Sequence, residues 1–209
     1  MARPREFDRE EALASAITVF AEHGYEGSST EILLKAMGLN RQSLYDTYGS
    51  KRQLYLEALR RYNHQNVADI VRDIAAGATP LAGLEQAFAA FVERAVAPPY
   101  PSCLGVGAIC EFGLRDAEVL AAGEASHALL LSAVTAAIEQ AKAAGQLDAK
   151  LETETAVDFL LATLAGLKLS ARGGVPRDRL QRMARLALQA LSGTPIVKSH
   201  KKGRGVSAP

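Results

Sequence analysis

The chain has 209 residues, of which 48% are hydrophobic, and its 24 lysine and arginine residues against 23 aspartate and glutamate residues give a formal net charge of +1. This composition excludes a largely disordered chain, and the balanced charge excludes binding to nucleic acid through overall charge alone. Two cysteines do not provide a disulfide framework. Apolar residues recur with a period near 3.6 over long stretches, and this pattern predicts an all-α fold.

The N-terminal quarter of the sequence predicts a helix over about 8–23, followed by a compact three-element segment over 29–59. Ser29 and Asn40 are suited to cap two short helices, and Gly38 lies between them, where the chain must turn with a positive φ. A helix, a tight glycine turn and a second helix form the helix-turn-helix unit, which places one helix in the DNA major groove.

Apolar periodicity, together with breaks at glycine and proline, predicts six further helices over 50–76, 80–96, 103–114, 117–144, 152–172 and 176–191. The total is about nine helices. We expect a helix-turn-helix DNA-binding domain over 1–50, a larger helical ligand-binding and dimerisation domain over 51–195, and a basic, disordered tail over 196–209. The tail could add non-specific DNA affinity or serve solubility alone, and the sequence leaves both readings open.

The predicted helix over 152–172 is apolar around most of its circumference, with Asp158 and Lys168 as interruptions. A helix that is apolar on nearly all sides must be covered on nearly all sides. Together with the helix over 176–192, it could pair with the same two helices of a second copy in a four-helix interface. Burial of 152–172 within its own domain is the alternative.

Residues on and around the second short helix are candidate DNA contacts. Arg41 and Gln42 can present hydrogen bonds to guanine or adenine edges. Asp46 would repel phosphate, so we expect it to orient Arg41 or Arg52 or to accept from a cytosine amino group. The full candidate set, which includes phosphate partners and an arginine arm for the minor groove, is Arg3, Arg5, Ser29, Thr30, Arg41, Gln42, Ser43, Tyr45, Thr47, Tyr48 and Lys51.

Residues 7–59 resemble the DNA-binding domain of the TetR family of bacterial transcriptional regulators, and the run 40–49 is similar to one recurring version of the family's recognition helix. Leu34, where a small residue is usual, and Tyr48, where phenylalanine is commoner, depart mildly from the pattern. The resemblance implies a homodimer and a ligand cavity in the C-terminal domain. It is carried by Ala16, Phe20, Gly24, Tyr25, Ser29, Leu33, Gly38, Leu39, Leu44, Tyr45, Tyr48, Gly49 and Lys51.

The same resemblance implies that the segment beginning at Cys103 lines the ligand cavity, and that a cysteine at this position can respond to electrophiles or oxidants. Cys103 lies near a predicted helix N-terminus, which favours a reactive thiolate. Both cysteines could instead be small buried hydrophobic residues. The candidate residues of a mainly apolar pocket are Tyr62, Phe88, Phe91, Tyr100, Cys103, Cys110, Glu111, Phe112, His127 and Leu130.

Sequence motifs of enzymes are missing. There is no GxSxG or HExxH motif, and the run 105–110 lacks the third glycine of a dinucleotide fingerprint. The cysteines and histidines lack the spacing of a structural zinc site, so we expect no enzyme activity, metal or cofactor. No uninterrupted apolar run reaches about 20 residues and no signal peptide is recognisable, so we expect a soluble, cytoplasmic protein without a membrane partner.

The family resemblance, together with the helix layout, implies a ligand- or redox-responsive transcriptional regulator, a repressor in preference to an activator. It would bind a palindromic double-stranded DNA operator as a homodimer, and a small-molecule effector or a thiol-modifying oxidant or electrophile would release it. The alternative is a helical small-molecule binding protein without a DNA function.

Overall fold

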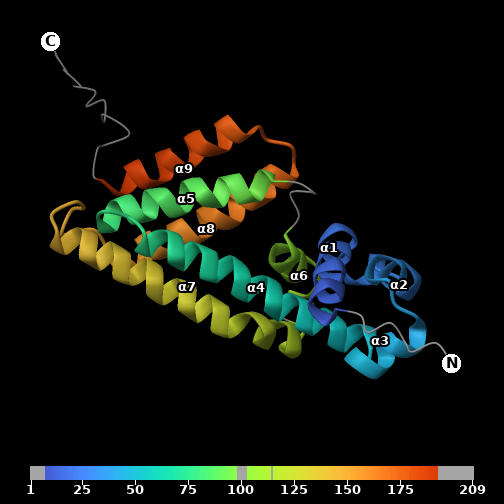
Figure 1. Ribbon diagram of the computed structural model, residues 1–209. Coiled ribbons are helices and arrows are strands. Elements are labelled where there is room, and N and C mark those ends of the chain that lie inside the picture. Colours follow the sequence, from blue (N-terminus) through green and yellow to red (C-terminus); the bar gives the residue numbers. More distant parts are fainter. Residues whose placement is uncertain (1–7, 98–102, 114, 193–209) are drawn as a thin grey trace, which may run out of the picture.

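The computed structural model describes residues 8–97, 103–113 and 115–192, and every regular element within these ranges is a helix. The all-α fold, with an N-terminal three-helix unit followed by a larger group of helices, is therefore confirmed for this part of the chain (Figure 1). The helices are α1 (Arg9–Gly27), α2 (Thr30–Met37), α3 (Arg41–Tyr48), α4 (Lys51–Ala75), α5 (Pro80–Val96), α6 (Leu104–Phe112), α7 (Ala117–Ala143), α8 (Thr153–Arg172) and α9 (Arg177–Leu191).

Local capping interactions define the two short helices. The Ser29 hydroxyl accepts a hydrogen bond from the Ile32 amide at 3.3 Å at the start of α2, and the Asn40 side chain accepts from the Ser43 amide at 2.8 Å at the start of α3. Gly38 follows α2 in the left-handed conformation, with φ of 65°. The predicted caps and the predicted glycine turn are confirmed.

Helix α1 differs from the predicted helix over 8–23, because it continues to Gly27 across a break. Gly24 has φ of 73° and ψ of 179°, a conformation that interrupts the helix and that glycine adopts at little steric cost. The amides that follow Gly24 are therefore available to acceptors outside α1.

Two buried clusters of side chains share α4. The first joins α1–α3 to the first half of α4, to α6 and to the start of α7, and it contains Phe20, Leu44 and Tyr55. The second joins the remainder of α4 to α5, α7, α8 and α9, and it contains Phe88 and Ile138. Since α4 runs from one cluster into the other (Figure 1), it connects the N-terminal unit mechanically to the C-terminal helices. The domain boundaries themselves remain predictions.

Helices α8 and α9 each have one buried and one exposed apolar face. Leu160 and Leu164 of α8 lie in the second cluster, whereas Leu169 of α8 is 58% exposed and Leu186 of α9 is 56% exposed. Burial within its own domain therefore accounts for only one face of the helix predicted over 152–172. The other face is uncovered in the single chain.

By its length and mean hydropathy, α7 could cross a membrane, although polar residues interrupt its apolar sequence. Core helices of soluble proteins meet the same measure. Val134, Ile138 and Ala141 of α7 are buried in the second cluster, so one side of the helix packs against its neighbours.

Candidate DNA-binding surface and effector region

The outward face of α3 carries polar side chains. Arg41, Gln42 and Tyr45 are exposed, and Ser43 and Thr47 are half-buried. Within the short helix, Leu44 is buried and fixes the orientation of this face relative to α1 and α4. The arrangement can present hydrogen-bonding groups to base edges, as the sequence suggested.

Two side-chain pairs order this face. The Arg41 guanidinium lies 2.6 Å from the Glu31 carboxylate of α2, and the Gln42 side-chain amide donates to the Asp46 carboxylate at 2.7 Å. The prediction that Asp46 orients Arg41 or Arg52 is therefore corrected, since Asp46 pairs with Gln42. Gln42 and Asp46 are four residues apart on α3, so their side chains are neighbours on the same face of the helix.

Tyr48 also differs from its predicted place among the DNA contacts. Its side chain is 5% exposed, its hydroxyl donates to the Arg9 carbonyl at 3.2 Å, and the Arg9 guanidinium lies 5.3 Å from its ring centroid. The burial of Tyr48 corrects its assignment as a contact: it positions the end of α3 against α1.

The remaining DNA candidates lie at helix starts. Ser29 is occupied as the cap of α2, Thr30 begins that helix, and the Lys51 ammonium lies 4.4 Å from the Tyr25 ring centroid. This cation–π contact holds Lys51 close to the start of α4. Arg3 and Arg5 lie outside the described residues.

Glu111 of α6 links the C-terminal helices to the break in α1. One of its carboxylate oxygens accepts from the Tyr25 amide at 2.9 Å, and the other accepts from the Glu26 amide at 2.8 Å. Glu111 was a candidate ligand contact because it is a polar residue in an otherwise apolar stretch of sequence. The structure instead engages both oxygens with the two amides that the turn at Gly24 leaves available.

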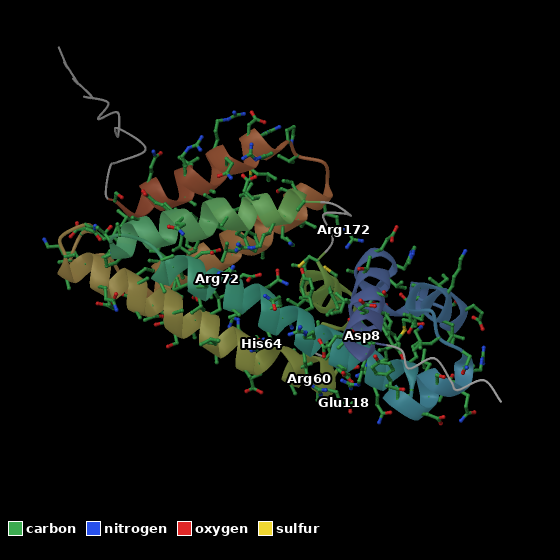
Figure 2. The ribbon with its side chains drawn as sticks, viewed as in Figure 1. Asp8, Arg60, His64, Arg72, Glu118 and Arg172 are labelled. Carbon is green, nitrogen blue, oxygen red and sulfur yellow. The ribbon has the colours of Figure 1, made fainter. Side chains whose placement is uncertain are left out.

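Two arginines add further links that sequence reasoning did not assign. The Arg172 guanidinium, at the end of α8, donates to the Ala21 carbonyl at 3.4 Å, and Arg52 of α4 lies 2.5 Å from Asp116 and 3.3 Å from Glu118. Figure 2 shows Arg172 and Glu118 at helix ends near the N-terminal unit. The hydrogen bond from Arg52 lowers the pKa of Asp116. These pairs join segments that are distant in sequence, so no local pattern could have indicated them.

Cys103 caps α6 and is half-buried, close to the polar groups of Tyr62 and Lys168. Its sulfur accepts a hydrogen bond from the Val106 amide at 3.3 Å. The pKa of Tyr62 is raised, mainly by burial of its side chain and secondly by the neighbouring Cys103. Lys168 of α8 is only 7% exposed, and its ammonium lies 5.5 Å from the Phe91 ring centroid. Burial lowers the pKa of Lys168, while its interaction with Cys103 opposes this shift. The positive charge of Arg94, on α5, also lowers the pKa of Lys168. We call Tyr62, Phe91, Arg94, Cys103 and Lys168 the effector region, as candidates for effector binding.

The predicted pocket residues divide between the two buried clusters and the surface, so a pocket formed by them stays a prediction. Phe88 and Phe91 are buried in the second cluster with Leu130 packed against it, whereas Tyr62 and Phe112 pack against the first. The side chains of Cys110 and His127 are exposed, which corrects the suggestion that Cys110 is a buried hydrophobic residue. Tyr100 lies outside the described residues.

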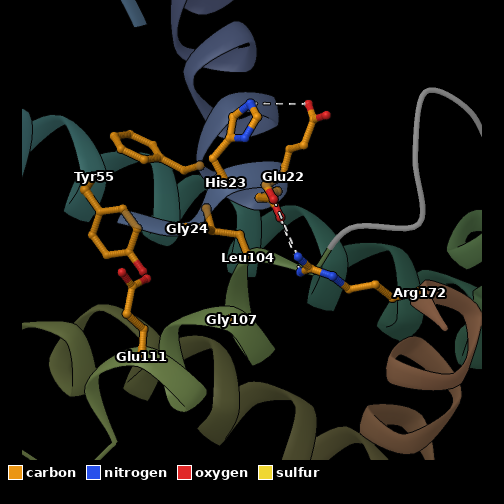
Figure 3. Close-up of a pocket in the computed structure, with 10 residues that line it drawn as sticks. Glu22, His23, Gly24, Tyr55, Leu104, Gly107, Glu111 and Arg172 are labelled. Atoms are coloured by element: carbon orange, nitrogen blue, oxygen red, sulfur yellow. Dashed lines mark hydrogen bonds and ion pairs between the residues drawn. The ribbon is translucent and has the colours of Figure 1, made fainter. Parts of the chain in front are cut away.

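A cavity of about 160 Å³ lies instead between α1, α4, α6 and α8 (Figure 3). Of the predicted pocket residues, Glu111 alone contributes to its lining, together with Phe20, Tyr55, Leu104 and Arg172. We call it the junction cavity. Within the described ranges, no cluster of three or more histidine, cysteine or acidic side chains could hold a metal ion.

Comparison with known proteins gives consistent matches. The family model described as bacterial regulatory proteins, tetR family, matches residues 12–58. The chain is 31% identical over 193 residues to the uncharacterized HTH-type transcriptional regulator YezE of Bacillus subtilis, which covers 91% of this chain and all of that protein. It is 24% identical over 189 residues to the HTH-type transcriptional repressor ComR of Escherichia coli, covering 90% of each chain.

Among solved structures, the fold is similar to that of a cysteine-substituted variant of the TetR family regulator CifR in complex with 26-base-pair double-stranded operator DNA. The TM-score is 0.77 at 31% identity, and the match covers 91% of this chain and 100% of the other.

Proposed function

Because the chain belongs to the TetR family of bacterial regulatory proteins and is a transcriptional regulator, we propose that it represses transcription by binding a palindromic operator as a homodimer. The observation that carries this proposal is the exposed polar face of α3, held in place by the buried Leu44 and Tyr48. A small-molecule carrier without a DNA function has no need of such a face. A protein that binds an operator must meet bacterial DNA, which supports a cytoplasmic location.

Arg41 and Gln42 are the proposed base-reading residues, with Ser43, Tyr45 and Thr47 as neighbours that reach bases or phosphates. Lys51 and Thr30, at helix starts, suit phosphate contacts. Arg41 must leave Glu31 to reach a guanine, and since both side chains are largely exposed this exchange costs little.

The test of DNA reading is a fluorescence-anisotropy titration of a DNA fragment from upstream of the chain's own gene. Arg41→Ala combined with Gln42→Ala should remove the preference for this fragment over scrambled DNA, since each good base contact contributes about 1–3 kcal/mol. Gln140→Ala combined with Lys150→Ala, which removes one glutamine and one positively charged side chain from exposed positions of the C-terminal helices and their connections, is the matched control. An unchanged preference in the first variant contradicts the proposal.

The homodimer is proposed to form through α8 and α9. Phe159 and Leu169 of α8 and Met183 and Leu186 of α9 are large apolar side chains left exposed in the single chain, and a second copy can cover them. Pairing would set two α3 helices roughly 34–36 Å apart, one turn of DNA. Sedimentation equilibrium at micromolar concentration should give twice the chain mass, and a single-chain mass would refute the dimer.

The signal is proposed to act through the start of α6. Modification of the Cys103 sulfur, or a ligand seated beside Lys168, would disturb the cap at Val106 and shift α6. Since α6 carries Glu111, such a shift would weaken the hydrogen bonds to the end of α1 and alter the spacing of the two DNA-binding units. Signal and operator must then oppose each other reciprocally, by about 1–3 kcal/mol in typical cases.

A thiol signal is tested with N-ethylmaleimide, which alkylates cysteine, in the same anisotropy titration. The Cys110→Ser variant retains Cys103 and should lose operator affinity on alkylation. The Cys103→Ser variant keeps an oxygen acceptor for the Val106 amide and should hold the operator after the same treatment. If both variants release the operator equally, the thiol of Cys103 is not the sensor.

A further inference from the structure

The first turn of α6 has an amide donor that no described residue uses. The amides of Val106 and Gly107 donate to the sulfur and to the carbonyl of Cys103, at 3.3 and 2.9 Å. The Leu104 amide makes a hydrogen bond with a tyrosine of α4. The amide of Gly105 is therefore left without a partner among the described residues. It lies at the positive end of the helix dipole, where an anion is stabilised.

Lys168 of α8 brings a buried cation to the same place. Its side chain is 7% exposed, and its ammonium makes no hydrogen bond or ion pair with any described residue. It lies 5.5 Å from the Phe91 ring centroid and close enough to Cys103, the N-cap of α6, to interact with its charge. A buried cation is costly unless an anion pairs with it. Two cationic features without an anion therefore meet at the start of α6.

The groups around Lys168 set the charge of the partner. Arg94 is the other cation that acts on Lys168, and its guanidinium is paired with the Asp73 carboxylate at 2.6 Å. Since Asp73 balances Arg94, Lys168 leaves one positive charge uncompensated, which a single negative charge matches. Among the described residues, the buried polar atoms that lack both a partner and access are the Tyr55 hydroxyl and one Arg94 nitrogen. The Lys168 ammonium, which also lacks a partner, is therefore accessible.

We propose that Lys168 and the start of α6 together bind a small organic monocarboxylate. One carboxylate oxygen accepts from the Lys168 ammonium and the other from the Gly105 amide, while the hydrocarbon part lies beside the Phe91 ring. This names the ligand class of the effector region, and its regulatory meaning rests on the proposed function. A carboxylate that joins α8 to α6 would move the start of α6, and Glu111 on the same helix would pass this movement to the end of α1.

The probe is butyrate, and butyramide, which has nearly the same shape and no charge, is its neutral counterpart. Each is titrated into the full chain without DNA while the amide NMR signals of Gly105 and Val106 are followed. Butyrate should shift both signals saturably and should bind more tightly than butyramide, because only butyrate supplies the missing negative charge. Absence of saturable butyrate binding, or equal affinities for the two probes, would overturn the proposal.

Lys168→Met removes the charge and keeps an unbranched side chain that suits a buried position, so it should fold. It should weaken butyrate binding about ten- to hundredfold, the effect of one hydrogen bond to a charged group, and leave butyramide unchanged. Lys150→Met, at an exposed position between α7 and α8, is the matched control and should bind butyrate as the wild type does. Unchanged butyrate affinity in Lys168→Met would contradict the assignment. Since no DNA is present, failure here removes the ligand class and leaves operator binding to its own titration.

Discussion

Replacing Glu111 by glutamine should loosen the link between α6 and the end of α1. The carboxylate accepts two amide hydrogen bonds, at 2.9 Å from Tyr25 and at 2.8 Å from Glu26. Glutamine keeps the shape of the side chain but has one acceptor oxygen in place of two and turns an amino group toward the second amide. Hydrogen bonds to a charged group contribute about 1.5–3 kcal/mol each, so loss of one lowers the free energy of unfolding by about that amount.

In a chain of this length, 1 kcal/mol corresponds to a change in Tm of about 2–4 °C, so Glu111→Gln should lower Tm by about 3–12 °C. The assay is differential scanning calorimetry at fixed protein concentration, because dimerisation makes Tm depend on concentration. Glu85→Gln, at an exposed position of α5 outside the ion pairs and hydrogen bonds of the described residues, is the matched control. Tm values within about 1 °C for both variants and the wild type would refute the assignment of Glu111 as a structural link.

Three further changes have defined outcomes. Glu31→Gln should release Arg41 and remove an anion from the DNA-facing surface, tightening DNA binding about threefold per half-site at low salt in an anisotropy titration. Leu186→Asp should separate the dimer, so that light scattering gives the 22.2 kDa of one chain. Asp116→Asn should lower stability at neutral pH. Because Arg52 lowers the pKa of Asp116, its contribution is complete above the carboxyl's ordinary pKa and is lost as pH falls through the lowered value, so acid melting curves of variant and wild type should converge.

The parts of the fold that depend on neighbouring residues could be predicted from the sequence. The caps at Ser29 and Asn40 and the positive φ at Gly38 follow from chemistry within one helical turn, and the exposed face of α3 follows from the period of its apolar residues. The exposed apolar face of α8 could also be predicted from the sequence, because a helix with apolar residues on nearly all sides has more apolar surface than one domain can cover.

The candidate site was less predictable where it depends on contacts between distant segments. Glu111 and Tyr25 are 86 positions apart, so a polar residue in an apolar stretch could be read as a ligand contact when it is a structural link. Phe88 was assigned to a pocket because of its apolar type, which core residues share. The cavity at Tyr55 has no sequence signal, because it arises where four helices fail to fill the space between them.

The most direct test of DNA reading by paired α3 helices is a DNase I footprint on the DNA upstream of the chain's own gene. The wild-type protein should protect two inverted half-sites whose centres lie about 10 base pairs apart, on one face of the duplex. The combined Arg41→Ala and Gln42→Ala protein should lose this pattern. A single protected half-site, or the same footprint with both proteins, would contradict the proposed reading.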